Sequence, residues 1–197
     1  MSKEKPARKP YPSDLTDAQW TILARLIPAA HPEHGGRPRE VDMREVVKTI
    51  LYVNRSGCQG DMLPHDVLPK STMYDYCAQW RDDGTWAKLL TALRERTRRQ
   101  AGREPTPSAA CLNSQAVKTT AMGSTERGDE GGKQVKGRKR HLVVDTLGLL
   151  VALVSTGAGL DDGVAAPTLL QQLEPNDCPR LETIFADHTY HNHVLQA

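Results

Sequence analysis

The hydrophobic pattern of the chain changes once, near residues 102–110, and this change constrains the fold more than any other feature. Before it, apolar residues recur at the spacing of amphipathic helices. After it, they gather in short runs that are typical of strands. The segment between, GREPTPSAA, is rich in Pro, Gly and Ser and is interpreted as a linker. We therefore predict an α+β protein with a helical domain at 14–101 and an α/β domain at 111–197.

The helical half shows caps followed by apolar stripes. Thr16 and Gln19 form a capping box, Leu15 and Trp20 flank it as a hydrophobic pair, and Pro28 stops the helix. Four helices are predicted in this way. The first spans about 17–27, and the second begins after an Asp42 cap and ends at Gly57. The third spans 72–81 with Ser71 as its cap, and the fourth begins after a Thr85 cap and continues into an arginine-rich run. One further short helical turn is expected within 58–71.

The second half is predicted to alternate strands with one helix. The predicted elements are a strand at 110–117, a hairpin of strands 139–146 and 149–156 joined at Leu147-Gly148, a helix at 163–173, and a strand at 180–187. The order strand, hairpin, helix, strand favours an α/β arrangement that could form half of a mixed sheet.

Positive charge is clustered, although the chain has 26 basic and 24 acidic residues and a formal net charge of only +2. An anionic partner would therefore have to bind local clusters. Residues 131–144 contain no acid and five basic residues: Lys133, Lys136, Arg138, Lys139 and Arg140. Other basic groups lie in the run 94–103, at Arg37 and Arg39 of a Gly/Pro-rich loop, and in residues 1–13, which are predicted to be a disordered arm. Such runs are most often solvated surfaces.

The four cysteines show neither C-x-x-C pairing nor repeated spacing, so neither a disulfide framework nor a zinc finger is indicated. They suit a reducing compartment. No apolar stretch approaches the ~20 residues of a membrane span. We expect a cytoplasmic protein without a membrane partner.

Two polar positions lie where α/β sheets gather functional groups, on strands or at their ends. Asn113 lies in the first predicted strand and Asp187 ends the last, and the two are adjacent if these strands pair. Paired carboxylates at such a place hold two Mg²⁺ ions for phosphoryl transfer. Here one member of the pair is a neutral amide, so Asp187 is the candidate metal ligand.

Other candidate ligands have structural explanations. Asp145, Asp161 and Asp162 could be additional metal ligands, but Asp145 suits the hairpin turn and Asp162 suits a helix cap. Three histidines, His188, His191 and His193, invite a transition-metal interpretation, and a tail that binds no metal is favoured instead.

Several segments together resemble a known family. In chain order they are LTDAQWTILARLIP, GGRPREVDMREVVKTILYVNRSGCQGDMLPHD, STMYDYCAQWRDDGTW, ACLNSQAVKTT, KQVKGRKRHLVVDTLGLLVAL, DDGVAAPTLL and IFADHTY. Over roughly residues 10–195 the chain resembles DDE-type transposases of the fourth/fifth insertion-sequence family. The resemblance implies a helix-turn-helix-like DNA-binding domain followed by a partial RNase H-like domain, in which three acids hold two Mg²⁺ or Mn²⁺ ions.

The resemblance also assigns roles to residues. The first family Asp falls on Asn113, a degenerate first acid, and the second on Asp187, while the third acid, a Glu, finds no counterpart. We therefore expect a C-terminally truncated member with weak or no metal binding. The chain also has QGD at 59–61 where the family has Gln-Trp-Arg, and Lys70 where it has an aromatic residue, which we interpret as decay.

The implied partner is double-stranded DNA of the transposon terminal repeats. The residues expected to contact it are Lys118, Lys133, Lys136, Arg138, Lys139 and Arg140 in the α/β domain, Arg37 and Arg39 in the loop, and Lys70, Ser71 and Tyr74 at the start of the third helix. Alternatively, Tyr74 faces the core together with Cys77 and Trp80.

These observations predict a transposase with a defective site for metal-dependent strand cleavage and transfer. The alternative is a non-catalytic repressor, or an inhibitor of a full-length sister transposase. A third hypothesis is a frameshift that supplies the missing Glu. An incomplete sheet would leave an edge strand exposed, so a homo-oligomer is a further expected partner.

Overall fold

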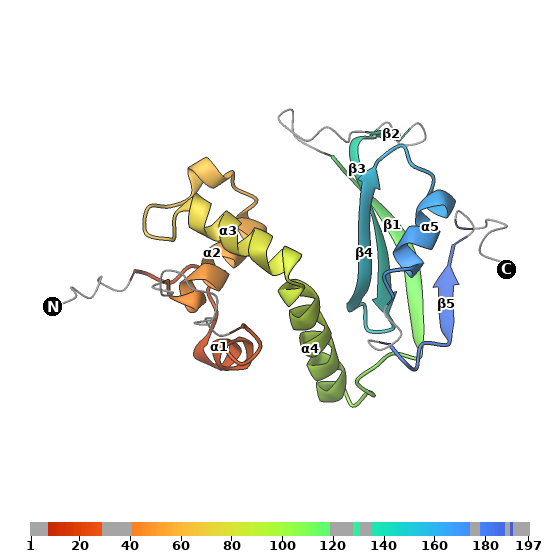
Figure 1. The fold of residues 1–197 in the computed structure, drawn as a ribbon, viewed down its shortest axis with the longest axis horizontal. Helices are drawn as coiled ribbons and strands as arrows, with labels where there is room; N and C mark the ends of the chain where they lie inside the picture. Colours follow the sequence, from red (N-terminus) through yellow and green to blue (C-terminus); the bar gives the residue numbers. More distant parts are fainter. Residues whose placement is uncertain are drawn as a thin grey trace. The chain divides into compact units, whose positions relative to one another are not determined.

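The computed structural model of the 197-residue chain describes residues 8–28, 41–118, 128–130, 135–173, 178–187 and 190 (Figure 1). It is an α+β structure that divides into two compact units, Met1–Leu89 and Leu90–Ala197. Each unit is described by itself. Among the described residues, no helix combines the length and apolar character that a membrane span requires.

The first unit is helical, as predicted. Its elements are α1 (Asp17–Leu23), α2 (Met43–Ser56), the 3-10 turn η2 (Gly60–Met62), α3 (Lys70–Asp82) and the start of α4 (Thr85–Gln100). The capping box of Thr16 and Gln19 is confirmed. α1 nevertheless ends earlier than predicted, because the amides of Leu26 and Ile27 both donate to the Leu23 carbonyl and tighten the chain into a turn.

The ends of α2 and α3 show which cap signals were interpreted correctly. Gly57 ends α2 in the left-handed region with φ 65°, where glycine carries no steric penalty. Asp42 caps the start of α2 by accepting from the Arg44 amide, 2.8 Å away. The predicted Ser71 cap is wrong: α3 begins at Lys70, and Pro69 is its N-cap without a side-chain hydrogen bond.

The core of the first unit is built on aromatic and β-branched side chains. Its buried members are Ile27, Val46, Val47, Trp80 and Leu89. Trp86, in the first turn of α4, packs edge-on against Trp80 with ring centroids 5.2 Å apart, and its indole N–H donates to the Cys77 carbonyl. The prediction that Trp80 faces the core is confirmed.

Residues 8–13, which belong to the predicted disordered arm, contact the helical unit. The Arg8 guanidinium donates to both carboxylate oxygens of Asp14, and a second contact reaches Glu45 at 3.4 Å. The Tyr11 hydroxyl donates to Asp66, 2.8 Å away. These contacts fix the segment because each joins the arm to a charged group of the folded unit.

The second unit contains a five-stranded sheet. Its elements are β1 (Ala109–Lys118), β2 (Gly128–Glu130), β3 (Val135–Asp145), β4 (Leu150–Gly157), α5 (Asp162–Leu170) and β5 (Thr183–Ala186). β3 pairs antiparallel with β1, β2 and β4, and β5 pairs parallel with β1. The predicted hairpin is confirmed, with Gly148 at φ 76° in its turn. β2 was not predicted.

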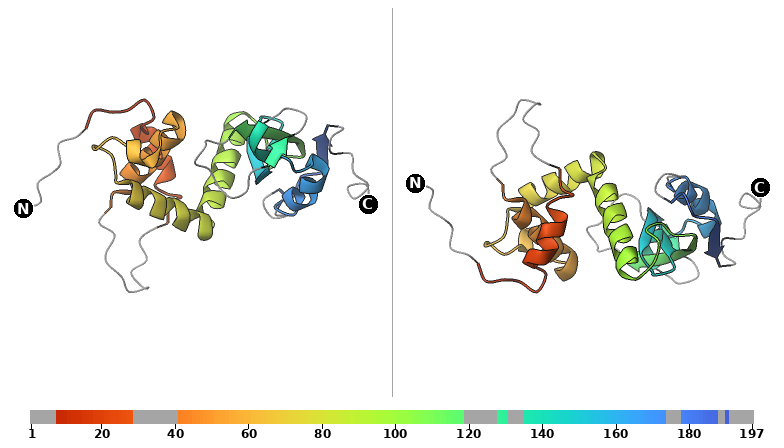
Figure 2. Two further views of the ribbon diagram at one scale, coloured as in Figure 1. Left: turned by 90° about the horizontal axis from the view of Figure 1, so that it is seen from above. Right: turned by 90° about the horizontal axis from the view of Figure 1, so that it is seen from below.

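Only one face of this sheet is covered by α5, which lies against it in Figures 1 and 2. The core on that face comprises Ala110, Leu112, Val143, Ala152, Ala166, Leu169 and Tyr190. Directly paired residues of neighbouring strands share a face, and successive residues alternate between faces. Asn113 therefore lies on the other face, where Leu153 and Phe185 are also exposed.

Part of the arginine run is internal. Arg98 pairs with Asp145, which also accepts from the backbone amides of Leu147 and Leu149. Arg94 donates to the Leu150 carbonyl. Both arginines are buried because they join α4 to the β3–β4 hairpin, and they are therefore unavailable to an anionic partner. Asp145 is the turn residue that the sequence predicted.

Candidate functional site

The candidate site lies where β1 and β5 run side by side. Their parallel register extends from Ala109 opposite Thr183 to Leu112 opposite Ala186. Asn113 and Asp187 are the next residues on each strand, so both lie at the same level and on the face opposite to Leu112. Both residues are exposed. The prediction that the first and last strands pair is confirmed, and their pairing brings the two candidate residues together.

The Asn113 amide already has a local partner. Its Oδ1 accepts from the Ser114 amide at 2.8 Å. On the other strand, the Asp187 carbonyl accepts from the Tyr190 amide at 3.2 Å. One side chain of the pair is thus neutral and engaged with its own backbone, and the other can supply one negative charge.

These residues do not fit a pair of divalent metal ions. Within the described part of the chain, no group of three or more His, Cys, Asp or Glu residues could hold a metal ion. The nearby acids serve other partners: Asp145 pairs with Arg98, Asp161 accepts from the Gly163 amide as the N-cap of α5, and Asp162 binds Ser114 and Lys139.

The capping assignment of Asp162 is therefore wrong, since Asp161 is the cap. The three histidines of the tail, His188, His191 and His193, lie outside the described residues.

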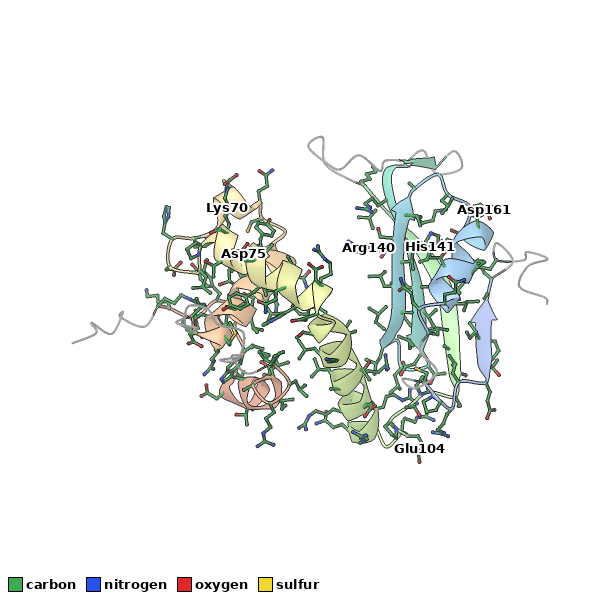
Figure 3. The ribbon with its side chains drawn as sticks, viewed as in Figure 1. Lys70, Asp75, Glu104, Arg140, His141 and Asp161 are labelled. Carbon is green, nitrogen blue, oxygen red and sulfur yellow. The ribbon has the colours of Figure 1, made fainter. Side chains whose placement is uncertain are left out.

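Strand alternation divides the basic run of β3 between the two faces of the sheet. Arg140 pairs with Gln115 and Arg138 with Val117, so both arginines belong to the face that carries Asn113. Arg140 is exposed. Figure 3 labels Arg140 beside its neighbour His141, which belongs to the opposite face.

Lys139 does not belong to this basic face. Its residue is only 6% exposed, and its Nζ donates to the Leu160 carbonyl at 3.0 Å and lies 3.1 Å from Asp162. The prediction that Lys139 contacts DNA is therefore corrected. Lys118 is exposed at the end of β1, whereas Lys133 and the Lys136 side chain lie outside the described residues.

The start of α3 carries the remaining candidates. Lys70 forms an ion pair with Asp61 of η2, and Ser71 is exposed (Figure 3 labels Lys70). Tyr74 is 52% exposed, so the alternative that it is a core residue is not supported. Arg37 and Arg39 lie outside the described residues.

The unusual residues at 59–61 fit their surroundings. A Cβ atom at Gly60 would approach the Tyr74 ring to 3.1 Å, so Tyr74 occupies space that a large side chain at 60 would need. Asp61 supplies the acid that pairs with Lys70. The structure accommodates these departures together, and nothing at this corner requires the interpretation of decay.

Sequence reasoning missed a buried polar cluster on the face covered by α5. Asp162 accepts from the Ser114 hydroxyl at 2.9 Å and lies 3.6 Å from His141 Nδ1. The other ring nitrogen of His141 shares a hydrogen bond with the Thr156 hydroxyl at 3.0 Å. Burial lowers the pKa of His141, opposed by the charge of Asp162. The alternation of β3 could have located this cluster, because it places Lys139 and His141 on one face.

Comparisons with known protein families match both halves of the chain. Residues 15–90 match a family described as "Putative transposase of IS4/5 family", and residues 104–196 match the family described as "Transposase DDE domain". Comparisons with curated proteins and with solved structures gave no significant match. The two matches follow one another along the chain, and their ranges agree with a helical part followed by a sheet-containing part.

Proposed function

Because the chain belongs to the IS4/5 family of DDE transposases, we propose that it binds double-stranded DNA at transposon ends and that its site for strand cleavage and transfer is defective. The observation that carries this proposal is the parallel pairing of β1 with β5, which sets the neutral Asn113 beside Asp187. The proposed domains are 14–101 for DNA binding and 111–197 for the catalytic fold, joined by the linker 102–110.

The strand arrangement supports an RNase H-like fold for the second domain. β4, β3 and β1 are neighbours in an antiparallel arrangement, and β5 adds parallel to β1 after a helix. The resemblance assigns the first and second acid positions of the family to 113 and 187, and the pairing of β1 with β5 supports this assignment.

The defect follows from charge. In the family, carboxylates concentrate negative charge on Mg²⁺ or Mn²⁺, which supplies electrostatic stabilisation during phosphoryl transfer. Asn113 contributes no charge, and the nearby acids of the described residues are engaged elsewhere. Groups that act as one site lose function together rather than in proportion, so Asp187 alone should not retain part of the rate.

DNA binding is proposed to use two surfaces. One is the exposed face of the second domain with Arg138 and Arg140, together with Lys118 at the end of β1, and the other is the start of α3 with Lys70, Ser71 and Tyr74. Arginine and lysine neutralise phosphates and release counterions, so affinity should fall steeply with salt. The proposed DNA contacts also include Lys133, Lys136, Arg37 and Arg39.

The experiment measures affinity for terminal-repeat DNA against salt concentration. Arg140→Ala is expected to reduce the slope of log affinity against log salt by about one, because one phosphate contact is lost. Arg99→Ala, which removes the same charge from an exposed position of α4, is the matched control and should leave the slope unchanged. Equal slopes for parent and Arg140→Ala would refute the proposed basic face.

A cleavage assay tests the defect directly. With Mg²⁺ or Mn²⁺, the chain is expected neither to nick nor to join terminal-repeat DNA, and Asn113→Asp alone should not restore either reaction. Metal-dependent nicking by the parent chain that Asp187→Ala abolishes would overturn the proposed defect.

A second candidate function is that of a non-catalytic repressor, or of an inhibitor of a full-length sister transposase. It is favoured by the separate core of the helical unit, which does not depend on the catalytic residues. Here Lys70→Ala should weaken binding to the repeats, and the parent chain should reduce transposition by an active relative. A parent chain that binds DNA without reducing transposition would exclude the inhibitor role.

A further inference from the structure

The buried carboxylate of Asp162 connects two strands and a helix behind the candidate site. Asp162 is the first residue of α5, and its side chain is 12% exposed. It accepts from the Ser114 hydroxyl of β1 at 2.9 Å, while Lys139 Nζ and His141 Nδ1 of β3 lie 3.1 Å and 3.6 Å away. Three elements therefore converge on one charged group.

The helix cap does not require a carboxylate at this position, although an acid in the first turn of α5 also suits the helix dipole. The N-cap of α5 is Asp161, which accepts from the Gly163 amide at 2.8 Å. Burying a charge is costly unless it is paired and hydrogen-bonded, and hydrophobic replacements are often no less stable. A buried charge of this kind is best explained by what it specifies, such as strand register.

Register is what this contact can specify. Ser114 pairs directly with His141, and a slip of β1 by one residue would move every β1 side chain to the opposite face. Ser114 would then leave Asp162, and its neighbour Asn113 would leave the exposed face. A contact made by Ser114 on the covered face thus determines the face on which Asn113 lies.

The other half of the site is tied to the same region. The Tyr190 amide donates to the Asp187 carbonyl, and the Tyr190 ring is buried in the core of the second unit. Burial raises the pKa of Tyr190 to about 12, and the charges of Asp162 and Asp187 act in the same direction. Tyr190, three residues after Asp187, is therefore held close to Asp162.

We propose that Asp162 is a positioning residue: through Ser114 it fixes the face and the level at which β1 presents Asn113 to Asp187. The proposal rests on the proposed function only in taking these two residues as the site. Asp162 acts from the face covered by α5, opposite to Asn113, and so is not proposed to contact substrate.

Disulfide trapping in the full chain measures this arrangement directly. The parent for the test carries Asn113→Cys and Asp187→Cys, with the exposed Cys111 changed to Ser to prevent competing bonds. Residues 113 and 187 lie opposite each other on adjacent strands, and such positions have the Cα separation that a disulfide needs. The parent should cross-link readily under mild oxidation, and failure to cross-link would overturn the proposal.

Ser114→Ala should then slow cross-linking by at least about fivefold, because it removes a hydrogen bond to a charged group. Ser114→Thr, which keeps the hydroxyl, should restore the rate. Ser155→Ala removes an exposed hydroxyl from the neighbouring strand β4 and should have no effect. Asp162→Ala, which removes the acceptor, should resemble Ser114→Ala, and if this variant does not fold, the rate of Ser114→Ala alone tests the role.

Unchanged cross-linking in Ser114→Ala, or equal slowing in Ser155→Ala, would overturn the positioning role. The result is independent of the proposed function. A chain that does not bind DNA would refute that function, and the cross-linking rates would still support or refute the role of Asp162.

Discussion

At the residue scale, α4 carries one buried and one exposed ion pair that should differ in their contribution to stability. The side chains of Arg98 and Asp145 are 6% and 0% exposed, whereas those of Arg99 and Glu95 are 59% and 29% exposed. A partner removed from a buried pair leaves an uncompensated charge, while an exposed pair is screened by water.

Arg98→Met is therefore expected to lower the free energy of unfolding by about 3–5 kcal/mol. Arg99→Met should lower it by less than about 1 kcal/mol. Urea unfolding followed by circular dichroism measures both variants. Similar small losses in the two would show that the Arg98 pair contributes little.

The buried imidazole of His141 predicts acid sensitivity. Burial lowers its pKa, Asp162 opposes this shift and Lys139 adds to it. The unfolded chain, with a pKa near 6.5, therefore takes up the proton first. The stability that neutral His141 contributes is complete above about pH 6.5 and is lost as the pH falls toward the folded-state pKa, by up to about 1.4 kcal/mol per pH unit.

The measurement is the free energy of unfolding between about pH 7.5 and pH 5.5. His141→Gln, which retains a polar group toward Thr156, should reduce the slope over this interval. His65→Gln removes an exposed histidine and should keep the parent slope. A slope unaffected by His141→Gln would assign the acid sensitivity to other groups.

The neighbouring positions of Asn113 and Asp187 could be predicted, and the orientation of side chains inside the sheet could not. The two residues were placed together because the first and last strands were expected to pair, and β1 and β5 do pair. Lys139 was misjudged and His141 was missed because hydropathy treats a run of basic residues as surface. Only the alternation of β3, anchored by the buried Val143, distinguishes the inward residues from Arg138 and Arg140.

At the element scale, the pairing of β1 with β3 depends on the absence of a side chain at Gly137. A Cβ atom at Gly137 would lie 2.0 Å from the Val117 carbonyl oxygen, a backbone atom of the paired strand. The strands must separate there to admit any side chain. Gly60 is a useful contrast, because its nearest neighbour is the half-exposed Tyr74 ring at 3.1 Å, which can move.

Gly137→Ala is expected to destabilise the second unit by about 1–3 kcal/mol, the usual cost of overpacking. Gly60→Ala should change stability by less than about 0.5 kcal/mol, as surface substitutions usually do. Thermal unfolding monitored by circular dichroism compares the two. If Gly60→Ala proved the more harmful, the close approach of β1 and β3 would not be the limiting contact.

Elements with a strong local signal were predicted best. The capping box at Thr16 and the glycine after α2 act within one turn, so the sequence specifies them almost alone. The short β2 could not be predicted, because three residues carry no periodicity and the strand exists only by pairing with β3. The start of α3 at Lys70 was missed because Pro69 caps without a side-chain bond.

At the scale of the whole molecule, the change in periodicity correctly predicted a helical half and a sheet-containing half. The two units have separate cores, one centred on Trp80 and the other on Val143 and Leu169. The division falls within α4, between Leu89 and Leu90. Sequence could not locate it there, because a continuous helix gives no signal where its packing partners change.

Separate cores predict that damage to one unit remains local. Trp80 is 1% exposed, and Trp80→Ala should lower the stability of the first unit by about 3–5 kcal/mol through loss of apolar contacts. Hydrogen exchange measured by mass spectrometry should then rise across α2 and α3, because local opening there becomes less costly. Amides of β1 and β3 should keep their parent protection.

Arg98→Met provides the reciprocal case, since its partner Asp145 belongs to the second unit. It should raise exchange in β3 and β4 and leave α2 and α3 unchanged. Exchange that rises everywhere in both variants would mean that the chain opens as one cooperative body. In that event α4, which contributes Trp86 to one core and Arg98 to the other unit, would be the element that transmits the opening.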